Sequence, residues 1–218
     1  MLGTNEFVSV FALTFSTFLP VINPFNGAMM FSAKTMDLSD RDRAFVSKRI
    51  AVYSLVLMLV CLTCGHLILR FFGISVGALR MAGGCVLFAA GWSALNAPSQ
   101  NEEHHEPAHL SRTQLKSMAF YPFTLPLTMG PGAIAVSVAL SASLPRDLVH
   151  ISATLCAALA TVVVTWFCYR YSDRLSRAAG AAGSDALTRI FAFILICLGV
   201  TVCWQGFSEL WSTLGAAK

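Results

Sequence analysis

Six apolar stretches, each long enough to cross a lipid bilayer, dominate this chain of 218 residues. A transmembrane helix needs about 20 consecutive apolar residues. Only 12% of the residues are charged, about half the share of a soluble domain, so few polar side chains are available to cover a surface in water. We therefore predict a single all-α integral membrane domain over residues 1–218. The six stretches are 7–35, 49–71, 76–97, 114–143, 148–169 and 186–210.

The first and fourth stretches are longer than an ordinary crossing, which takes about 20 residues. Both carry prolines near the middle, one within LPVINPFNG and the other within YPFTLPLTMGPG. Proline removes a backbone donor and clashes with the preceding helical turn. We therefore expect both helices to be broken at mid-membrane, over residues 20–27 and 122–132. The second half-helix should begin near Asn26 in the first span and at Pro131 in the fourth.

These two broken stretches also indicate an internal repeat. Each has an aromatic residue, then Pro-x-x-x-Pro, then Gly, and a further match relates ALRM around Arg80 to LTRI around Arg189. We predict two three-helix repeats, residues 1–100 and 114–218, joined by a cytoplasmic linker at 101–113. Because three spans per repeat is an odd number, the second repeat enters the membrane from the opposite side and the repeat is inverted.

The positive charges predict how the chain is oriented. In a six-span arrangement only four of the 15 Lys and Arg residues fall on the side of the termini. Lys and Arg gather in cytoplasmic loops. We therefore expect a multi-pass inner membrane protein with both termini periplasmic and the loops after spans one, three and five in the cytoplasm. The four residues on the periplasmic side are Arg70, Arg80, Arg146 and Lys218.

Broken spans at matching positions in two repeats predict a binding site at the membrane midplane. Two helix N-termini would meet there and favour an anionic group. Carbonyls freed by the prolines would favour a cation, so the expected substrate is a small zwitterion. The candidate substrate-binding residues are Asn23, Pro24, Asn26, Gly27, Thr124, Pro126, Thr128, Gly130 and Gly132.

No acidic residue lies near the middle of a span, so the sequence offers no carboxylate proton relay. If transport is coupled to an ion, backbone carbonyls and the Asn and Thr side chains would have to hold it. Such an oxygen-rich site is compatible with Na⁺. A passive exchanger fits the sequence equally well, and we expect no other cofactor and no metal site.

Arg80 and Arg189 are the expected supporting residues, near the starts of the third and sixth spans. One interpretation is that each side chain extends to the membrane interface. The other is that each guanidinium bonds the carbonyls of a broken span and holds that span open.

Several function classes are disfavoured by the sequence. The Lys and Arg residues lie between apolar stretches and form no stripe for nucleic acid. An enzyme is not expected, because no nucleophile, base and orienting group occur together in the broken segments. The loop 101–109 is rich in His and Glu but matches no closed metal site, and we interpret it as a solvated linker. The expected partners are the lipid bilayer and a small zwitterion, with a homo-oligomer left open.

At these motifs the chain resembles the MarC family of six-span membrane proteins. The resemblance implies an inverted-repeat transporter, and it implies a preference for glycine, alanine and similar substrates as in characterised relatives. The chain departs from the family pattern at Ala192, where Gly is usual, and at Thr201, where Gln is common. The matching segments are Asn23-Pro24, Pro126, Thr128, Gly130-Pro131-Gly132, Ile134, the run from Phe72 to Ser75, the run from Leu79 to Gly84, Arg189, Gly199 and Gly206.

The leading hypothesis is thus a secondary transporter of small neutral amino acids that works by alternating access. One alternative is efflux of another small solute or of a metal ion, with the loop 101–109 as a sensor. Another is an accessory or scaffold protein that transports nothing. Uptake of labelled glycine or alanine into proteoliposomes would distinguish the three.

Overall fold

The computed structural model describes residues 2–96, 111–143, 145 and 147–215, and every regular element among them is a helix. Five candidate spans and one bent helix pair are long and apolar enough to cross a membrane. The prediction of an all-α integral membrane protein is confirmed. In chain order the elements are α1 (Leu2–Ile22), α2 (Pro24–Lys34), α3 (Asp40–Phe72), α4 (Val76–Leu95), α5 (Arg112–Met118), the π-helix η1 (Ala119–Thr128), α6 (Pro131–Ser143), α7 (Leu148–Arg170) and α8 (Ser172–Gly215).

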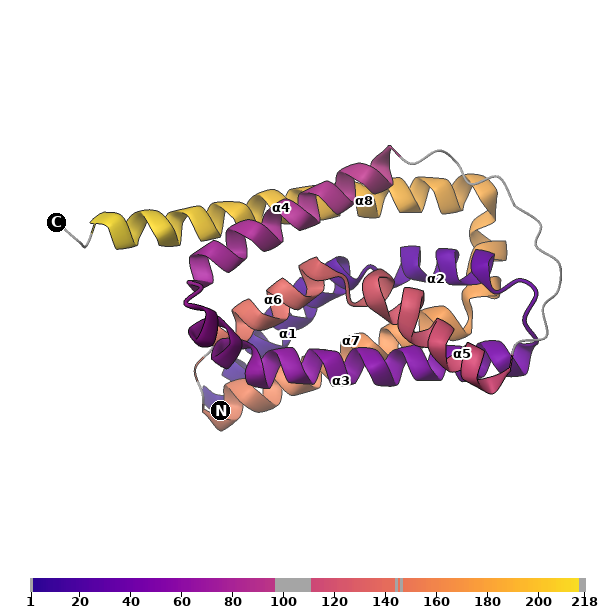
Figure 1. The fold of residues 1–218 in the computed structure, drawn as a ribbon, viewed down its shortest axis with the longest axis horizontal. Helices are drawn as coiled ribbons and strands as arrows, with labels where there is room; N and C mark the ends of the chain where they lie inside the picture. Colours follow the sequence, from indigo (N-terminus) through magenta and orange to yellow (C-terminus); the bar gives the residue numbers. More distant parts are fainter. Residues whose placement is uncertain (1, 97–110, 144, 146, 216–218) are drawn as a thin grey trace.

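The first and fourth spans are the two that are built from more than one helix. Helices α1 and α2 together make the candidate span Asn5–Lys34, while α5, η1 and α6 make a span bent by 68°. Figure 1 shows α2 and α6 running from the middle of the molecule towards opposite ends. An inverted repeat requires this antiparallel direction, and the repeat layout itself stays a prediction. The loop 101–109 lies outside the described residues.

A helical segment that the apolar pattern did not predict precedes the sixth span. The candidate span is Asp185–Thr213, close to the expected start at residue 186, but helix α8 already starts at Ser172, and Gly180 interrupts its helical geometry with φ 65° and ψ 175°. A positive φ suits glycine because it has no Cβ. In Figure 1 the first part of α8 turns across one end of the molecule before the helix runs beside α4.

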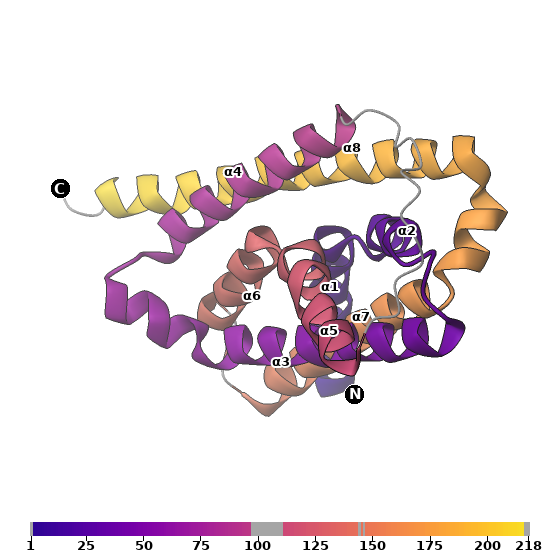
Figure 2. The same cartoon turned by 45° about the vertical axis from the view of Figure 1, so that its right-hand side comes forward.

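Helices α4 and α8 form a layer of their own, which Figures 1 and 2 both show beside the remaining helices. Their shared face is made of small residues. A Cβ added at Gly84 would lie 2.7 Å from the Gly199 carbonyl oxygen, and one added at Gly91 would lie 2.7 Å from the Ala192 carbonyl oxygen. The backbones therefore approach as closely as small residues permit. The small residues recur every seven positions on both helices: Gly77, Gly84 and Gly91 face Gly206, Gly199 and Ala192.

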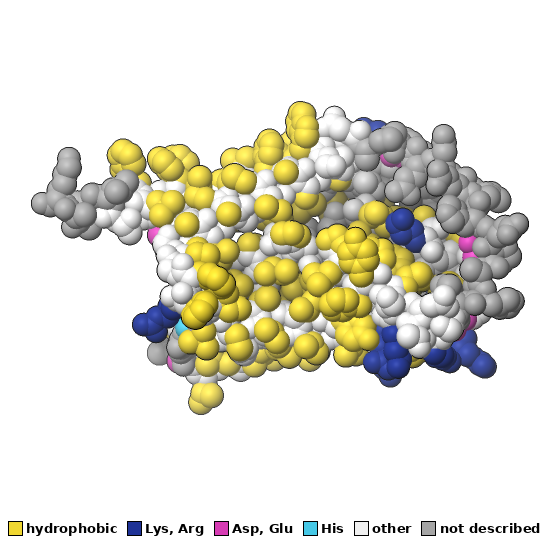
Figure 3. Space-filling model, in the orientation of Figure 1, with side chains coloured by type: hydrophobic (Ala, Val, Ile, Leu, Met, Phe, Trp, Pro, Cys, Tyr) yellow, Lys and Arg dark blue, Asp and Glu magenta, His cyan; other side chains and the backbone are white. Residues whose placement is uncertain are grey.

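The charges gather towards the ends of the helices and leave a broad apolar belt between them. Figure 3 shows most of the dark blue Lys and Arg side chains at one end of the visible face, with hydrophobic side chains covering the middle. Figure 1 places the start of α1 and the end of α8 at the other end of the molecule. The two described ends of the chain therefore lie at the same end of the molecule, opposite most of the positive charges visible on this face.

We expect Gly84→Val to destabilise the protein by about 1–3 kcal/mol, because the added methyl groups would overlap the backbone of α8. Ala89→Val is the matched control, since Ala89 is an exposed residue of the same helix. Thermal unfolding of the purified proteins in detergent would measure the stability of both variants. Equal melting temperatures for the two variants would contradict the close α4–α8 contact.

Candidate functional site

The break in the first span is a single residue, Asn23. Its backbone is left-handed, with φ 49° and ψ 62°, a conformation that Asn adopts more readily than most residues. The Asn23 side-chain oxygen accepts a hydrogen bond from the Asn26 N–H at 3.3 Å and so caps α2. Pro24 follows as the first residue of α2, a position where proline's missing N–H does not matter.

The expected break over residues 20–27 was too wide. Helix α1 continues through Pro20 to Ile22, and α2 begins at Pro24 instead of near Asn26. The Gly27 N–H, expected to be unpaired, donates to the Asn23 carbonyl at 3.0 Å. The local cause is the capping geometry of Asn23, which restarts the helix at once and satisfies the amides that the sequence appeared to leave open.

The break in the fourth span is longer and has two parts. Inside η1 the Tyr121–Pro122 and Leu125–Pro126 bonds are cis, and Tyr121 and Leu125 have extended backbone angles. The chain then leaves the helix at Met129 and Gly130, and α6 begins at Pro131 as predicted.

Two carbonyls in this segment are satisfied by nearby side chains. Thr124 donates its hydroxyl to the Ala119 carbonyl and Thr128 donates to the Phe123 carbonyl, both at 2.7 Å. Both threonines are 0–1% exposed. The span therefore loses its regular helix without leaving these carbonyls unpaired in the membrane interior.

The space beside two candidate glycines is filled by side chains of the protein. A Cβ at Gly27 would overlap the Tyr169 hydroxyl, and a Cβ at Gly132 would overlap the Leu87 side chain. At Gly130 the Pro126 carbonyl lies 2.9 Å from such a Cβ. The glycines thus allow close packing at these positions.

Tyr169 of α7 joins the two broken spans. Its hydroxyl lies 2.8 Å from the Thr128 hydroxyl. Because the Thr128 proton is directed to the Phe123 carbonyl, Tyr169 is the donor in this bond. The Tyr169 ring stacks on Phe31 of α2 with ring centres 5.4 Å apart, and its hydroxyl lies against Gly27. One side chain, 1% exposed, therefore contacts both broken spans.

Two hydrophobic clusters lie on either side of the breaks. The first cluster contains Phe18 and Ile22 before Asn23, and the second contains Ala28 and Phe31 after it. The same change of cluster occurs along the fourth span, from Phe123 to Met129, along α3, from Ile50 to Met58, and along α7, from Val162 to Tyr169. Each of these four elements therefore passes from one cluster to the other at the same level.

Buried polar side chains occupy the level between the clusters, and we call them the polar layer. All are at most 7% exposed, and none is charged. The Ser54 hydroxyl has no hydrogen-bond partner among the described residues, although Ser54 is 1% exposed. A buried, unpaired hydroxyl is costly in an apolar interior. The Thr154 hydroxyl of α7 also lacks a partner among the described residues. The members of the polar layer are Asn23, Ser54, Thr124, Thr128 and Thr165.

The structure brings the candidate residues of the two broken spans to this one level. Asn23, Thr124 and Thr128 belong to the polar layer, while Asn26 is half-buried one turn into α2. Their role in binding stays a prediction. Sequence reasoning missed Ser54, Thr165 and Tyr169, because single hydroxyl groups in regular apolar helices carry no motif.

The two supporting arginines bond groups away from the breaks. Arg80 donates to Glu209 at 2.7 Å and to Ser143 at 2.6 Å. Arg189 donates to Asp185 at 3.2 Å and to the Leu95 carbonyl at 3.4 Å. Neither guanidinium bonds a carbonyl at the breaks, so the suggestion that they hold the broken spans open was wrong. Each has a carboxylate partner instead: Arg80, in the second turn of α4, pairs with Glu209, and Arg189, inside α8, pairs with Asp185 one turn earlier.

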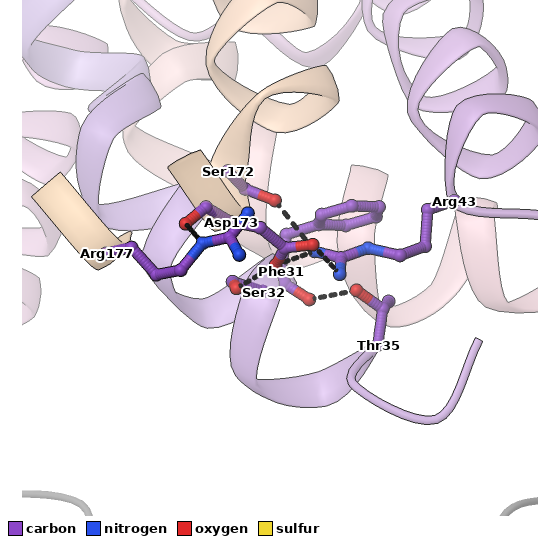
Figure 4. A network of polar contacts seen from close by, with 7 residues as sticks. All are labelled: Phe31, Ser32, Thr35, Arg43, Ser172, Asp173 and Arg177. Carbon is purple, nitrogen blue, oxygen red and sulfur yellow. Dashed lines mark hydrogen bonds and ion pairs between the residues drawn. The ribbon is translucent and has the colours of Figure 1, made fainter. Parts of the chain in front are cut away.

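A network of polar contacts closes the opposite end of the bundle from the chain termini (Figure 4). Arg43 of α3 forms an ion pair with Asp173 of α8 and donates to Ser172 at 3.0 Å. Ser32 of α2 donates to Asp173 at 2.7 Å. The Arg43 guanidinium also lies 5.8 Å from the centre of the Phe31 ring. The network therefore ties the end of the first broken span to the starts of α3 and α8.

The charge state of Asp173 follows from these contacts. Burial alone would raise the pKa of the Asp173 carboxyl, but hydrogen bonds from Ser32 and Arg43, together with the Arg43 charge, hold it below its usual value. A lowered pKa in the folded state means that the network stabilises the fold at neutral pH. This contribution disappears as the pH falls through the folded-state pKa.

Asn23→Ala should lower stability by about 1–2 kcal/mol, because alanine is strained in the left-handed region and cannot cap α2. Asn23→Gly removes the cap but accepts the backbone angles, so we expect a smaller loss. Melting temperatures in detergent would rank the variants. A larger loss for glycine than for alanine would contradict the left-handed break.

Comparison with known proteins agrees with the fold. The model of the MarC family integral membrane proteins matches residues 8–211. The inner membrane protein MarC of Salmonella typhimurium is 31% identical over 207 residues, covering 89% of this chain and 92% of the relative. A membrane protein of Archaeoglobus fulgidus is 30% identical over 203 residues, covering 93% of this chain and 94% of the relative. No solved structure matches significantly. With a match over nearly its whole length, the chain belongs to the MarC family of integral membrane proteins.

Proposed function

We propose that this protein is a secondary transporter that carries small neutral amino acids across the inner membrane. The observation that carries the proposal is the polar layer, where two broken spans meet inside an apolar bundle between two hydrophobic clusters. Relatives are named inner membrane proteins, which supports that location. The positive charges at one end support an orientation with both termini periplasmic.

The chemistry of the polar layer favours a neutral substrate. Its side chains are hydroxyls and one amide, so a ligand with net charge would find no opposite side-chain charge there. Helix α6 begins at this level, and the first-turn N–H groups of Gly132 and Ala133 have no acceptor within their helix. They supply donors for a carboxylate, and the Ser54 hydroxyl supplies an additional polar contact. Na⁺ coupling is compatible with these oxygen groups.

The two hydrophobic clusters then act as barriers on either side of the substrate. The described conformation is closed, because Tyr169 and Leu87 fill the space beside Gly27 and Gly132. Alternating access requires each barrier to open in turn. On the cytoplasmic side this means separating α2 from α3 and α8, and the Arg43–Asp173 network holds those three helices together.

Uptake of labelled glycine and alanine into proteoliposomes, with and without a Na⁺ gradient, tests the transport proposal. We expect uptake that saturates and that unlabelled alanine inhibits. Liposomes with a protein carrying Gly27→Val are the control, because the added side chain would overlap Tyr169. Uptake equal to that of empty liposomes would favour an accessory protein, and uptake of only another solute would favour the efflux alternative.

Tyr169→Phe should weaken substrate binding, because it removes the hydroxyl that bonds Thr128 of the fourth span. It keeps the ring that packs on Phe31 of the first span. Loss of one hydrogen bond of about 0.5–1.5 kcal/mol predicts a KM change of roughly 2- to 12-fold. Thr128→Val removes this bond together with the bond from Thr128 to the Phe123 carbonyl, so its effect should be smaller in the Tyr169→Phe background than in the wild type, but not zero. Additive effects of the two changes would contradict a shared role.

Asp173→Asn should loosen the cytoplasmic closure, because it removes a charge-assisted bond of about 1.5–3 kcal/mol while keeping the side-chain shape. A cysteine introduced at buried Thr35, in a background without native cysteines, should then react faster with a membrane-impermeant maleimide. Asp185→Asn is the matched control, since Asp185 pairs with Arg189 on an exposed surface. Unchanged labelling in Asp173→Asn would show that other contacts close this end.

A further inference from the structure

A cationic pocket lies on the outer face of α3, away from the polar layer. It has a volume of about 250 Å³ and is lined by Phe45, Lys48, Arg49 and Val52. Counted from Phe45, the other three stand three, four and seven positions further on, so all four share one face of the helix. Arg112 of α5 adds a third positive charge beside the same Phe45 ring.

The Phe45 ring holds two guanidinium groups. The Arg49 carbon Cζ lies 5.3 Å from the ring centre and the Arg112 Cζ lies 4.6 Å from it. Both are in the range of cation–π contacts, which orient the guanidinium plane and leave its N–H groups free to bind an anion. The two groups lie within about one Debye length, 10 Å at 0.1 M salt, so they repel each other.

These charges have no acidic partner in the part of the chain that the structure describes. The ion pairs found there involve other residues, and none includes Lys48, Arg49 or Arg112. A cluster of like charges without a counter-charge is stabilised by a bound anion. The donor set, two guanidinium groups and one ammonium, suits a phosphate group.

The depth of the pocket in the membrane suggests the source of the phosphate. Lys48 and Arg49 stand where the apolar stretch of α3 begins, at the level of lipid headgroups. Below them Val52, Val56 and Val60 form an exposed apolar row that is 44–53% exposed. These valines are spaced four apart, so the row continues the face of the pocket towards the membrane centre. A phospholipid has both parts that this face requires, a phosphate at the top and an acyl chain below.

We propose that this face binds one anionic phospholipid of the cytoplasmic leaflet, with its phosphate between Lys48, Arg49 and Arg112 and an acyl chain along Val52 and Val56. The site is independent of the proposed transport function. The bound lipid fixes the position of α3 against α5, the first helix of the fourth span, because the two helices contribute cations to the same headgroup.

Native mass spectrometry of the purified full-length protein with phosphatidylglycerol or phosphatidylcholine tests the site. The wild-type protein should retain phosphatidylglycerol in preference to phosphatidylcholine. The double variant Lys48→Gln/Arg49→Gln should bind it roughly 25-fold more weakly, about 5-fold for each charge removed. Arg41→Gln/Arg174→Gln removes two exposed charges elsewhere at the same end and should bind as the wild type does.

Each other outcome has a definite meaning. An equal loss of phosphatidylglycerol affinity in the two double variants would overturn the site, because it would show a general effect of positive charge. Competition by free glycerol phosphate at the affinity of the lipid would overturn the acyl-chain contact. The melting temperature of each variant is measured without added lipid. Phosphatidylglycerol should then raise the melting temperature of the wild type more than that of Lys48→Gln/Arg49→Gln, and an equal rise would also overturn the proposal.

Discussion

The rest of this structure depends on how backbone polar groups are satisfied where two spans lose their helical hydrogen bonds. In a membrane interior no water is available for them, and each unpaired group costs several kcal/mol. Asn23 solves the problem with its own side chain, which caps the helix that follows. Thr124 and Thr128 solve it by bonding carbonyls within η1.

Much of this fold could be predicted from the sequence, because apolar length and proline position act locally. The six stretches and the start of α6 at Pro131 follow directly from them. The width of the first break did not follow, since proline at position 20 was expected to end a helix that in fact continues to Ile22. A sequence pattern shows where a helix is weakened, whereas the side-chain cap at Asn23 decides where it stops.

The candidate site was predictable only in part, for a related reason. The residues at the breaks have unusual backbone requirements and therefore a visible pattern. Tyr169 and Ser54 lie in regular helices and matter only through what packs against them in three dimensions. The function assigned to the glycines shows the same limit. Gly27 does leave space, but Tyr169 fills that space.

The small-residue face between α4 and α8 does not by itself fix how the two helices align along their length. Because the small residues repeat every seven positions on both helices, a slide of one heptad, about 10.5 Å, would restore two of the three pairings. Packing alone therefore tolerates more than one alignment of the two helices. The ion pair between Arg80 and Glu209 does not repeat, and it would be broken by such a slide. A charge pair near the membrane surface thus selects a single alignment for a contact in which small residues repeat along both helices.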